Sequence, residues 1–114
     1  MARKISTIQD LHEYFIGVVT RAEHHAQNVE EIIYPLLGMI VAYKDDDTDI
    51  EVWGQNDNLG NLLWAIIKGT RYAFRYDHNK VSIEIRKDTY RGLLIETITN
   101  KNTLLQLRTV FKSL

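Results

Sequence analysis

Along the first third of the chain, an apolar residue recurs every three or four positions, from Ile8 to Met39. This spacing places the apolar side chains on one side of an α-helix, so it predicts helix over roughly residues 7–43. A straight helix of that length would be about 55 Å long. A chain of 114 residues folds to a radius of gyration of only about 13 Å. The helical segment must therefore bend, break, or find a partner for its overhang.

Two interpretations of this segment remain open. Asn28 followed by Glu31 is a signal for the start of a second helix, which would divide the run near Ala26 to Asn28. Alternatively, one helix continues and is kinked by Pro35, whose ring clashes with the carbonyl group of Glu31. We favour two helices, or one sharply kinked helix, over an unbroken one.

An acidic turn at residues 44–49 separates this helical segment from a region that is typical of strands. The clearest strand is Thr70 to Tyr76, in which Tyr72, Phe74 and Tyr76 share one face while Arg71 and Arg75 point to the other. A loop is expected from Gln55 to Gly60. We predict about five strands: Asp49 to Trp53, Leu62 to Ile67, Thr70 to Tyr76, Val81 to Arg86 and Gly92 to Thr99.

Capping boxes mark two helix starts. Ser6 with Gln9 predicts the start of the first helix, and Thr103 with Gln106 opens a helix at the end of the chain. Because the strands follow one another through short links, the sheet is expected to be antiparallel. The sequence thus predicts one α+β domain over residues 1–114, with an N-terminal helical segment, a sheet of about five strands and a C-terminal helix.

Composition limits the chemistry of the chain. It has no cysteine and a net charge of −1, which excludes disulfides and thiolate nucleophiles and gives no general attraction to nucleic acid. The most apolar stretch, Ile32 to Tyr43, is too short to span a bilayer, and no signal peptide is evident. We therefore expect a cytoplasmic protein with no membrane or nucleic-acid partner. Nucleophile and phosphate-binding motifs are missing from the sequence, so we expect no cofactor and do not favour an enzyme.

Adjacent histidines, His24 and His25, are the first candidate ligand-binding residues, because histidine serves readily as a base or metal ligand near neutral pH. Neighbours on a helix point about 100° apart, so the two cannot share one face, and no metal site is predicted. The plainer interpretation of His25 is a core or interface residue. The acidic turn is expected to be solvated, since Ile50 and Asn56 stand where a calcium-binding EF-hand loop needs glycine and glutamate.

Charged and aromatic residues of the strands supply the other candidates. Arg71 and Arg75 present a face that suits a carboxylate or phosphate ligand, and Tyr72 and Tyr76 offer polar contacts. Because arginines and aromatics alternate between faces, this strand does not fit single-stranded nucleic acid, and the plainer interpretation is a core row beside a solvated row. Candidate interface residues are Phe15, Val18 and Trp53.

The segment Leu11 to Val29 resembles a group of small proteins encoded by integron gene cassettes. The similarity rests on YFIGV at Tyr14 to Val18, on the paired histidines of RAEHHAQNV, on GTRYAF at Gly69 to Phe74 and on the closing Phe-x-x-Leu. Pro35 departs from the pattern, where an ordinary helix former is expected. The resemblance implies an α+β protein of unassigned function and transfers no catalytic residue.

Two functions are consistent with these features. One is a non-enzymatic binding or interaction module that acts as a homo-oligomer, with a dimer through the N-terminal helices as the simplest arrangement. The other is a small-molecule-binding protein or small enzyme, with a pocket between helices and sheet that uses His24 or His25.

Overall fold

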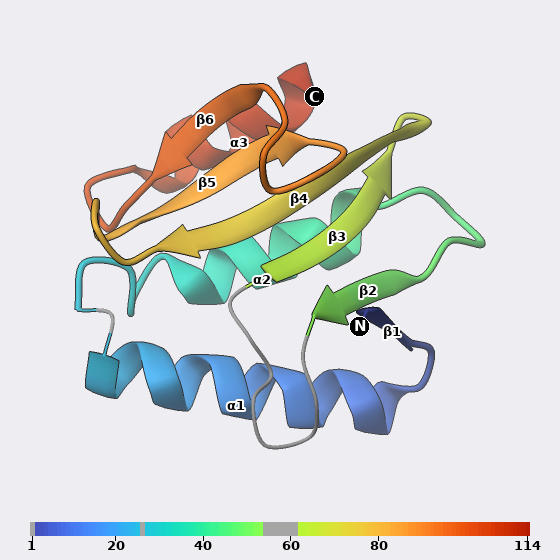
Figure 1. Cartoon of the computed structure of the whole chain (residues 1–114), viewed down its shortest axis with the longest axis horizontal. Helices are drawn as coiled ribbons and strands as arrows, with labels where there is room; N and C mark the ends of the chain where they lie inside the picture. Colours follow the sequence, from blue (N-terminus) through green and yellow to red (C-terminus); the bar gives the residue numbers. More distant parts are fainter. Residues whose placement is uncertain (1, 26, 54–61) are drawn as a thin grey trace.

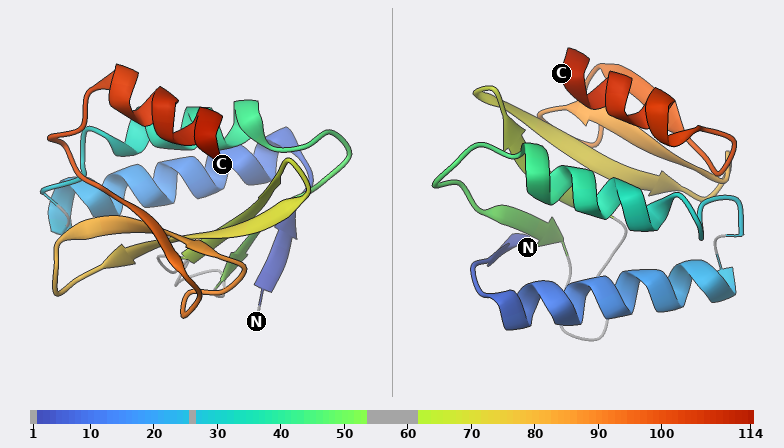
Figure 2. Two further views of the ribbon diagram at one scale, coloured as in Figure 1. Left: turned by 90° about the horizontal axis from the view of Figure 1, so that it is seen from above. Right: turned by 180° about the vertical axis from the view of Figure 1, so that it is seen from behind.

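Alternation along the strands determines how the molecule is layered. In a computed structural model of the chain, residues 2–25, 27–53 and 62–114 are described. Within these parts, three helices lie against one face of a six-stranded antiparallel sheet (Figures 1 and 2). The elements are β1 (Ala2–Ile5), α1 (Ile8–His25), α2 (Ile33–Tyr43), β2 (Ile50–Trp53), β3 (Leu62–Ile67), β4 (Thr70–Asp77), β5 (Ser82–Lys87), β6 (Leu94–Ile98) and α3 (Leu104–Ser113).

The strands lie in the sheet in their order along the chain, and each pairs with its neighbours in sequence. The sheet has one strand more than predicted, because Ala2–Ile5 pairs with β2, with Ile5 opposite Ile50. The start of β5 also differs from the prediction. Val81 has a φ of 51° and belongs to the turn before the strand. The predicted loop Gln55 to Gly60 lies outside the described residues.

The long helical stripe is divided into two helices, as the favoured interpretation required. α1 ends at His25 and α2 begins at Ile33, with a turn over residues 27–32 between them. An 18-residue helix such as α1 is about 27 Å long, which fits within the longest extent of 33 Å. Pro35 does not kink a continuous helix. It lies in the first turn of α2, where a missing backbone N–H leaves no hydrogen bond unmade.

The caps of the helices are only partly as predicted. Thr103 and Gln106 do form a capping box at α3. At α1 the prediction of Ser6 is wrong by one residue, since the Thr7 hydroxyl accepts a 3.0 Å hydrogen bond from the Asp10 N–H. Asn28 does not cap α2, and its side-chain amide instead donates to the Val81 carbonyl over 2.7 Å.

One asparagine holds the turn between α1 and α2 in place. The Asn100 Oδ1 accepts hydrogen bonds from the backbone N–H groups of Glu31 and Ile32, at 3.1 and 3.0 Å. Its Nδ2 donates to the Gln27 carbonyl and to the Glu30 carboxylate, at 3.3 and 2.6 Å. Because Asn100 follows β6 directly, it fastens the break in the helical segment to the edge of the sheet.

The main core lies between the helices and the sheet. Phe111 of α3 is fully buried, stacks on Phe74 at 6.0 Å between ring centroids and meets Tyr43 of α2 at 5.5 Å. Seen from behind, α2 lies between α1 and α3 (Figure 2).

The tight turn between β3 and β4 contains Lys68 and Gly69, both with positive φ. The Asp45 carboxylate accepts 2.7 Å hydrogen bonds from both of their N–H groups, so the acidic turn is not simply solvated.

Candidate functional site

A cavity of about 510 Å³ lies between α1, α2 and the helix-covered face of the sheet. Its volume falls within the range of about 300–1,000 Å³ that is typical of small-molecule sites. Apolar side chains from α2, from the turn before it and from three strands form its floor, and each is less than a tenth exposed. They are Val29, Ile33, Leu36, Leu37, Ile40, Leu63, Phe74 and Ile83.

Polar side chains line one end of this cavity, where α1 and β4 both end (Figure 1). Arg21 and His25 are four residues apart in the last turns of α1, so they lie on the same side of that helix. Tyr76 ends the helix-facing row of β4, and the His78 ring meets it edge-on at 4.8 Å. The cavity thus has a buried apolar floor and a polar, more exposed rim.

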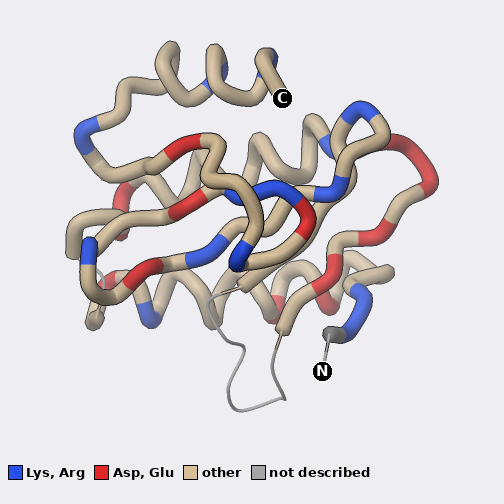
Figure 3. Tube along the Cα trace, turned by 45° about the horizontal axis from the view of Figure 1, so that its top comes forward, with Lys and Arg blue, Asp and Glu red and all other residues tan. Residues whose placement is uncertain are grey.

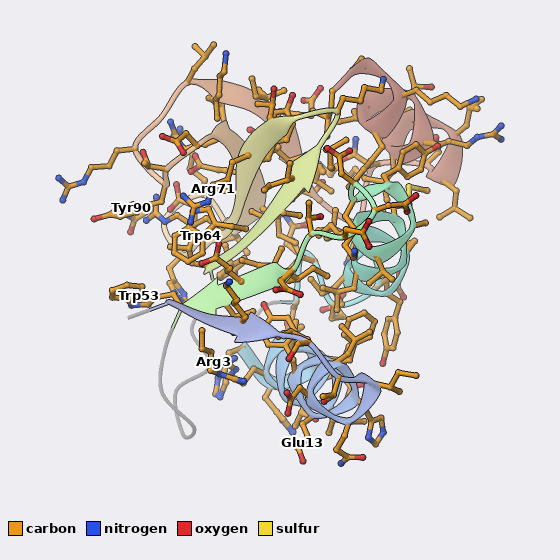
Figure 4. The ribbon with its side chains drawn as sticks, turned by 90° about the vertical axis from the view of Figure 1, so that its right-hand side faces the viewer. Arg3, Glu13, Trp53, Trp64, Arg71 and Tyr90 are labelled. Atoms are coloured by element: carbon orange, nitrogen blue, oxygen red, sulfur yellow. The ribbon has the colours of Figure 1, made fainter. Side chains whose placement is uncertain are left out.

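A buried phenol also contributes to the cavity wall. Tyr14 of α1 is 3% exposed, and burial raises the pKa of its hydroxyl above the ordinary value, so the group stays protonated. The positive charges of Arg21 and Arg3 act in the opposite direction on the same pKa, because they favour the phenolate. Arg3 extends from β1 beside α1 (Figure 4), and its Nε has no hydrogen-bond partner among the described residues.

On its other face the sheet carries a row of aromatic and cationic side chains (Figure 4). Trp53 and Trp64 meet edge-on at 6.4 Å, and the Arg71 guanidinium lies 4.7 Å above the Trp64 ring. The guanidinium groups of Arg75 and Arg91 lie 5.8 and 5.2 Å from the Tyr90 ring. We call these residues the aromatic–cationic row. No helix covers it in the parts of the chain that the structure describes.

A buried carboxylate anchors the arginines of this open face. The Glu84 side chain is 1% exposed and binds Arg86 through two hydrogen bonds, of 2.9 and 3.0 Å. Arg75 lies 3.5 Å from the same carboxylate. The hydrogen bonds to Glu84 raise the pKa of the Arg86 guanidinium. Figure 3 shows the resulting pattern, with acidic and basic positions side by side across β4 and β5 and an acidic run in the link before β2.

The structure places the candidate residues in different parts of the molecule. His25, Arg75, Tyr76, Val18 and Trp53 border the cavity. The Arg75 guanidinium itself turns to the open face, where it lies near Glu84 and Tyr90.

The remaining candidates lie elsewhere. His24 is exposed and does not border the cavity, although its ring lies 6.2 Å from that of His25. Tyr72 is buried in the main core, and Phe15 packs against that core from α1. Arg71 lies over Trp64 in the aromatic–cationic row.

Three polar residues of the cavity, Tyr14, Arg21 and His78, were not candidates from the sequence. Arg21 had a usable signal, since it lies one helical turn before His25. Tyr14 had a weaker one, because it is three residues after Leu11 and belongs to a wider apolar arc than the stripe alone. His78 had none, since only the pairing of β4 with β5 brings its turn to the cavity.

Residues 2–25, 27–53 and 62–114 contain no group of three or more His, Cys, Asp or Glu side chains that could hold a metal ion. None of the helices formed by these residues is long and apolar enough to cross a membrane.

The fold is a two-layer α+β arrangement with a cavity between helices and sheet. The chain belongs to an integron cassette protein family, whose sequence profile, described as "Integron cassette protein VCH_CASS1 chain", matches residues 11–108. The match agrees with the resemblance seen in the sequence, and the family has no assigned function. No curated protein matches the chain.

Proposed function

We propose that this protein is a non-enzymatic binding protein that holds a small, largely apolar molecule in the cavity between α1, α2 and the sheet. The observation that carries the proposal is the contrast between the buried apolar floor and the polar rim. Such a site removes apolar surface of a ligand from water and fixes its orientation with a few polar groups. Of the two histidines singled out in the sequence, only His25 borders this cavity.

A neutral fluorescent probe, N-phenyl-1-naphthylamine, tests the proposal directly. We expect its emission to rise on binding at micromolar protein concentration. Replacing Val18 by Trp should abolish the rise, because Val18 lines the cavity from α1 and the larger side chain fills it. Ile16→Trp is the matched control, since Ile16 lies on the same helix but is 52% exposed.

The outcomes are distinct when folding is checked by circular dichroism. Loss of binding in Val18→Trp alone supports the cavity as the site. Probe binding that is equal in both variants, or missing in the wild type, contradicts it.

A second function, assembly with another copy of the chain, is supported by the edge of the sheet that lies farthest from β1. β6 is an edge strand, and Leu93, Leu94 and Ile95 are at least 38% exposed along it. On the adjacent α3, Leu104 and Leu105 are 62% and 71% exposed. Edge strands with apolar side chains pair readily, and two copies of an antiparallel edge can meet across a two-fold axis. This would place a dimer interface at β6 and α3 rather than at the N-terminal helices.

Native mass spectrometry and light scattering test this assembly. We expect a dimer at micromolar concentration that Leu94→Lys and Leu105→Glu convert to a monomer. A monomeric wild type, or a dimer unaffected by both substitutions, contradicts the interface.

A further inference from the structure

The polar end of the cavity carries ionisable side chains, whereas its floor is apolar. Among the described residues that border it, the ionisable side chains are two arginines, two histidines and two tyrosines, and none is Asp or Glu. One of the arginines, Arg75, turns its guanidinium to the open face of the sheet, so Arg21 is the arginine that serves this cavity. Arg21 and His25 approach from α1, and His78 approaches from the turn after β4. A ligand group at this end of the cavity therefore meets basic side chains from two separate elements.

Helix ends do not set the charge of this region. α1 ends at His25, which places a partial negative charge near the rim. α2 begins at Ile33, and its first turns contribute Ile33, Leu36 and Leu37 to the same cavity with a partial positive charge. The two helix dipoles oppose each other here, so the side chains decide the sign.

Tyr14 lies close to two of the positive charges near the cavity. Arg21 and Arg3 both shift the pKa of the Tyr14 hydroxyl downward, which requires their positive charges to lie near that hydroxyl. Because burial nevertheless keeps the phenol protonated, Tyr14 offers a hydrogen-bond donor rather than a negative charge. Donors and positive charges are the groups that bind an anion.

We propose that the ligand is an amphipathic monoanion, with an apolar body on the floor formed by α2 and the sheet and a carboxylate-like group beside Arg21 and His25. This inference rests on the proposed function, since it assigns the ligand class of the same cavity. The preference arises because an anion gains from the arginine and the hydrogen-bond donors around it, whereas an ammonium group of the same size meets no Asp or Glu side chain among the described residues that border the cavity.

Displacement of N-phenyl-1-naphthylamine by three molecules with the same ten-carbon chain tests the charge preference. They are decanoate, decanol and decylamine, each used below the concentration at which it forms micelles. We expect decanoate to displace the probe at a concentration at least tenfold lower than decanol, and decylamine to be weaker than decanol. The ratio of decanol to decanoate concentrations is the measured quantity.

The variants separate recognition of the anion from damage to the cavity. Arg21→Gln should lower the ratio severalfold towards one, and His25→Gln, at an exposed helix end, should lower it less. Arg108→Gln, on the exposed side of α3, should leave the ratio unchanged. A variant that merely distorts the cavity weakens decanoate and decanol together, so its ratio stays near the wild-type value.

The two proposals fail in different ways. Equal displacement by decanoate and decanol in the wild type overturns the anion preference and leaves the apolar binding site intact. An unchanged ratio in both Arg21→Gln and His25→Gln also overturns it. If the probe itself does not bind the wild-type protein, the proposed function fails first.

Discussion

The two faces of the sheet are built from the same strands but are stabilised by different interactions. On the helix-covered face, apolar side chains such as Phe74 and Ile85 pack against α2 and α3. On the open face, the aromatic–cationic row is held by stacked rings and by arginines gathered around Glu84. Because successive residues of a strand point to opposite faces, one strand supplies both kinds of surface. The covered face has room for a ligand, whereas the open face offers charge at its surface.

Removal of the largest buried ring should have the greatest effect on the covered face. Phe111→Ala deletes a fully buried side chain that contacts Phe74 and Tyr43. We expect the free energy of unfolding to fall by about 3–5 kcal/mol, from lost burial and the space left behind. Urea unfolding followed by circular dichroism measures it. Arg108→Ala, on the exposed side of α3, should change it by no more than about 0.5 kcal/mol. Equal losses in the two variants would show that α3 does not pack as described.

Neutralisation of Glu84 tests the open face. Glu84→Gln leaves Arg86 and Arg75 without the carboxylate that both approach. We expect a loss of about 2–3 kcal/mol, less than the ~3–5 kcal/mol that follows when a fully buried pair is broken, because both arginines reach water. The same urea experiment measures it, with Glu13→Gln on the exposed side of α1 as the control. A neutral outcome for Glu84→Gln would mean that charge does not stabilise this face.

The turn between α1 and α2, which borders the cavity, should be destabilised by loss of the Asn100 side chain. Asn100→Ala removes the four hydrogen bonds of its side chain to residues 27–32. The expected cost is about 1–3 kcal/mol, because backbone groups of the turn lose their partners. Asn102→Ala removes the hydrogen bond that its side-chain oxygen accepts from the Thr99 N–H and should cost less. Hydrogen exchange should also speed up in the α1–α2 turn of the first variant. Equal protection in both variants would contradict the role of Asn100.

The smallest predicted effect concerns pH and the turn between β4 and β5. The Asn79 N–H donates to the Asp77 carboxylate over 2.9 Å and holds its pKa below the ordinary value. The ionised form is therefore favoured in the folded state, and its stabilisation is present at neutral pH. It is lost as pH falls below the ordinary carboxyl pKa of about 3.9 and through the folded-state value. At pH 7 we expect Asp77→Asn to have a lower melting temperature than the wild type. This difference should shrink as the pH is lowered to 2. A constant difference would contradict this assignment, and Asp88→Asn, at an exposed carboxylate, is the control.

Elements with a strong local pattern were predictable from the sequence. β3 begins and ends where the apolar run Leu62 to Ile67 does, and the Thr103–Gln106 box marks the start of α3. The first strand was not predictable, because Ala2–Ile5 is short, carries Arg3 and Lys4, and gains its partner only from β2. The need for glycine at position 92 was not predictable either. A Cβ there would collide with the Lys87 carbonyl, which depends on how the loop before β6 folds back.

The cavity was only partly predictable, because it depends on contacts between segments that are far apart in the sequence. His25 and Tyr76 were candidates because their residue types and local periods drew attention to them. Their meeting with Arg21, Tyr14 and His78 depends on how α1 lies against the sheet, which no local pattern encodes. The sequence also suggested that arginines and aromatics stay apart within β4. The open face brings them together from different elements, with Trp64 of β3 below Arg71 of β4.

The pairing of β1 with β2 has a consequence for the order of assembly. A pair such as β3 and β4 is joined through a tight turn, whereas Ile5 must find Ile50 across both α1 and α2. Closing this longer loop costs more chain entropy, so β1 is expected to join a sheet that has already formed. On the ribosome, β1 emerges before the other strands of the sheet and would then be among the last of them to dock. Until it does, β2 is the outer strand of the growing sheet, with its backbone exposed to other chains.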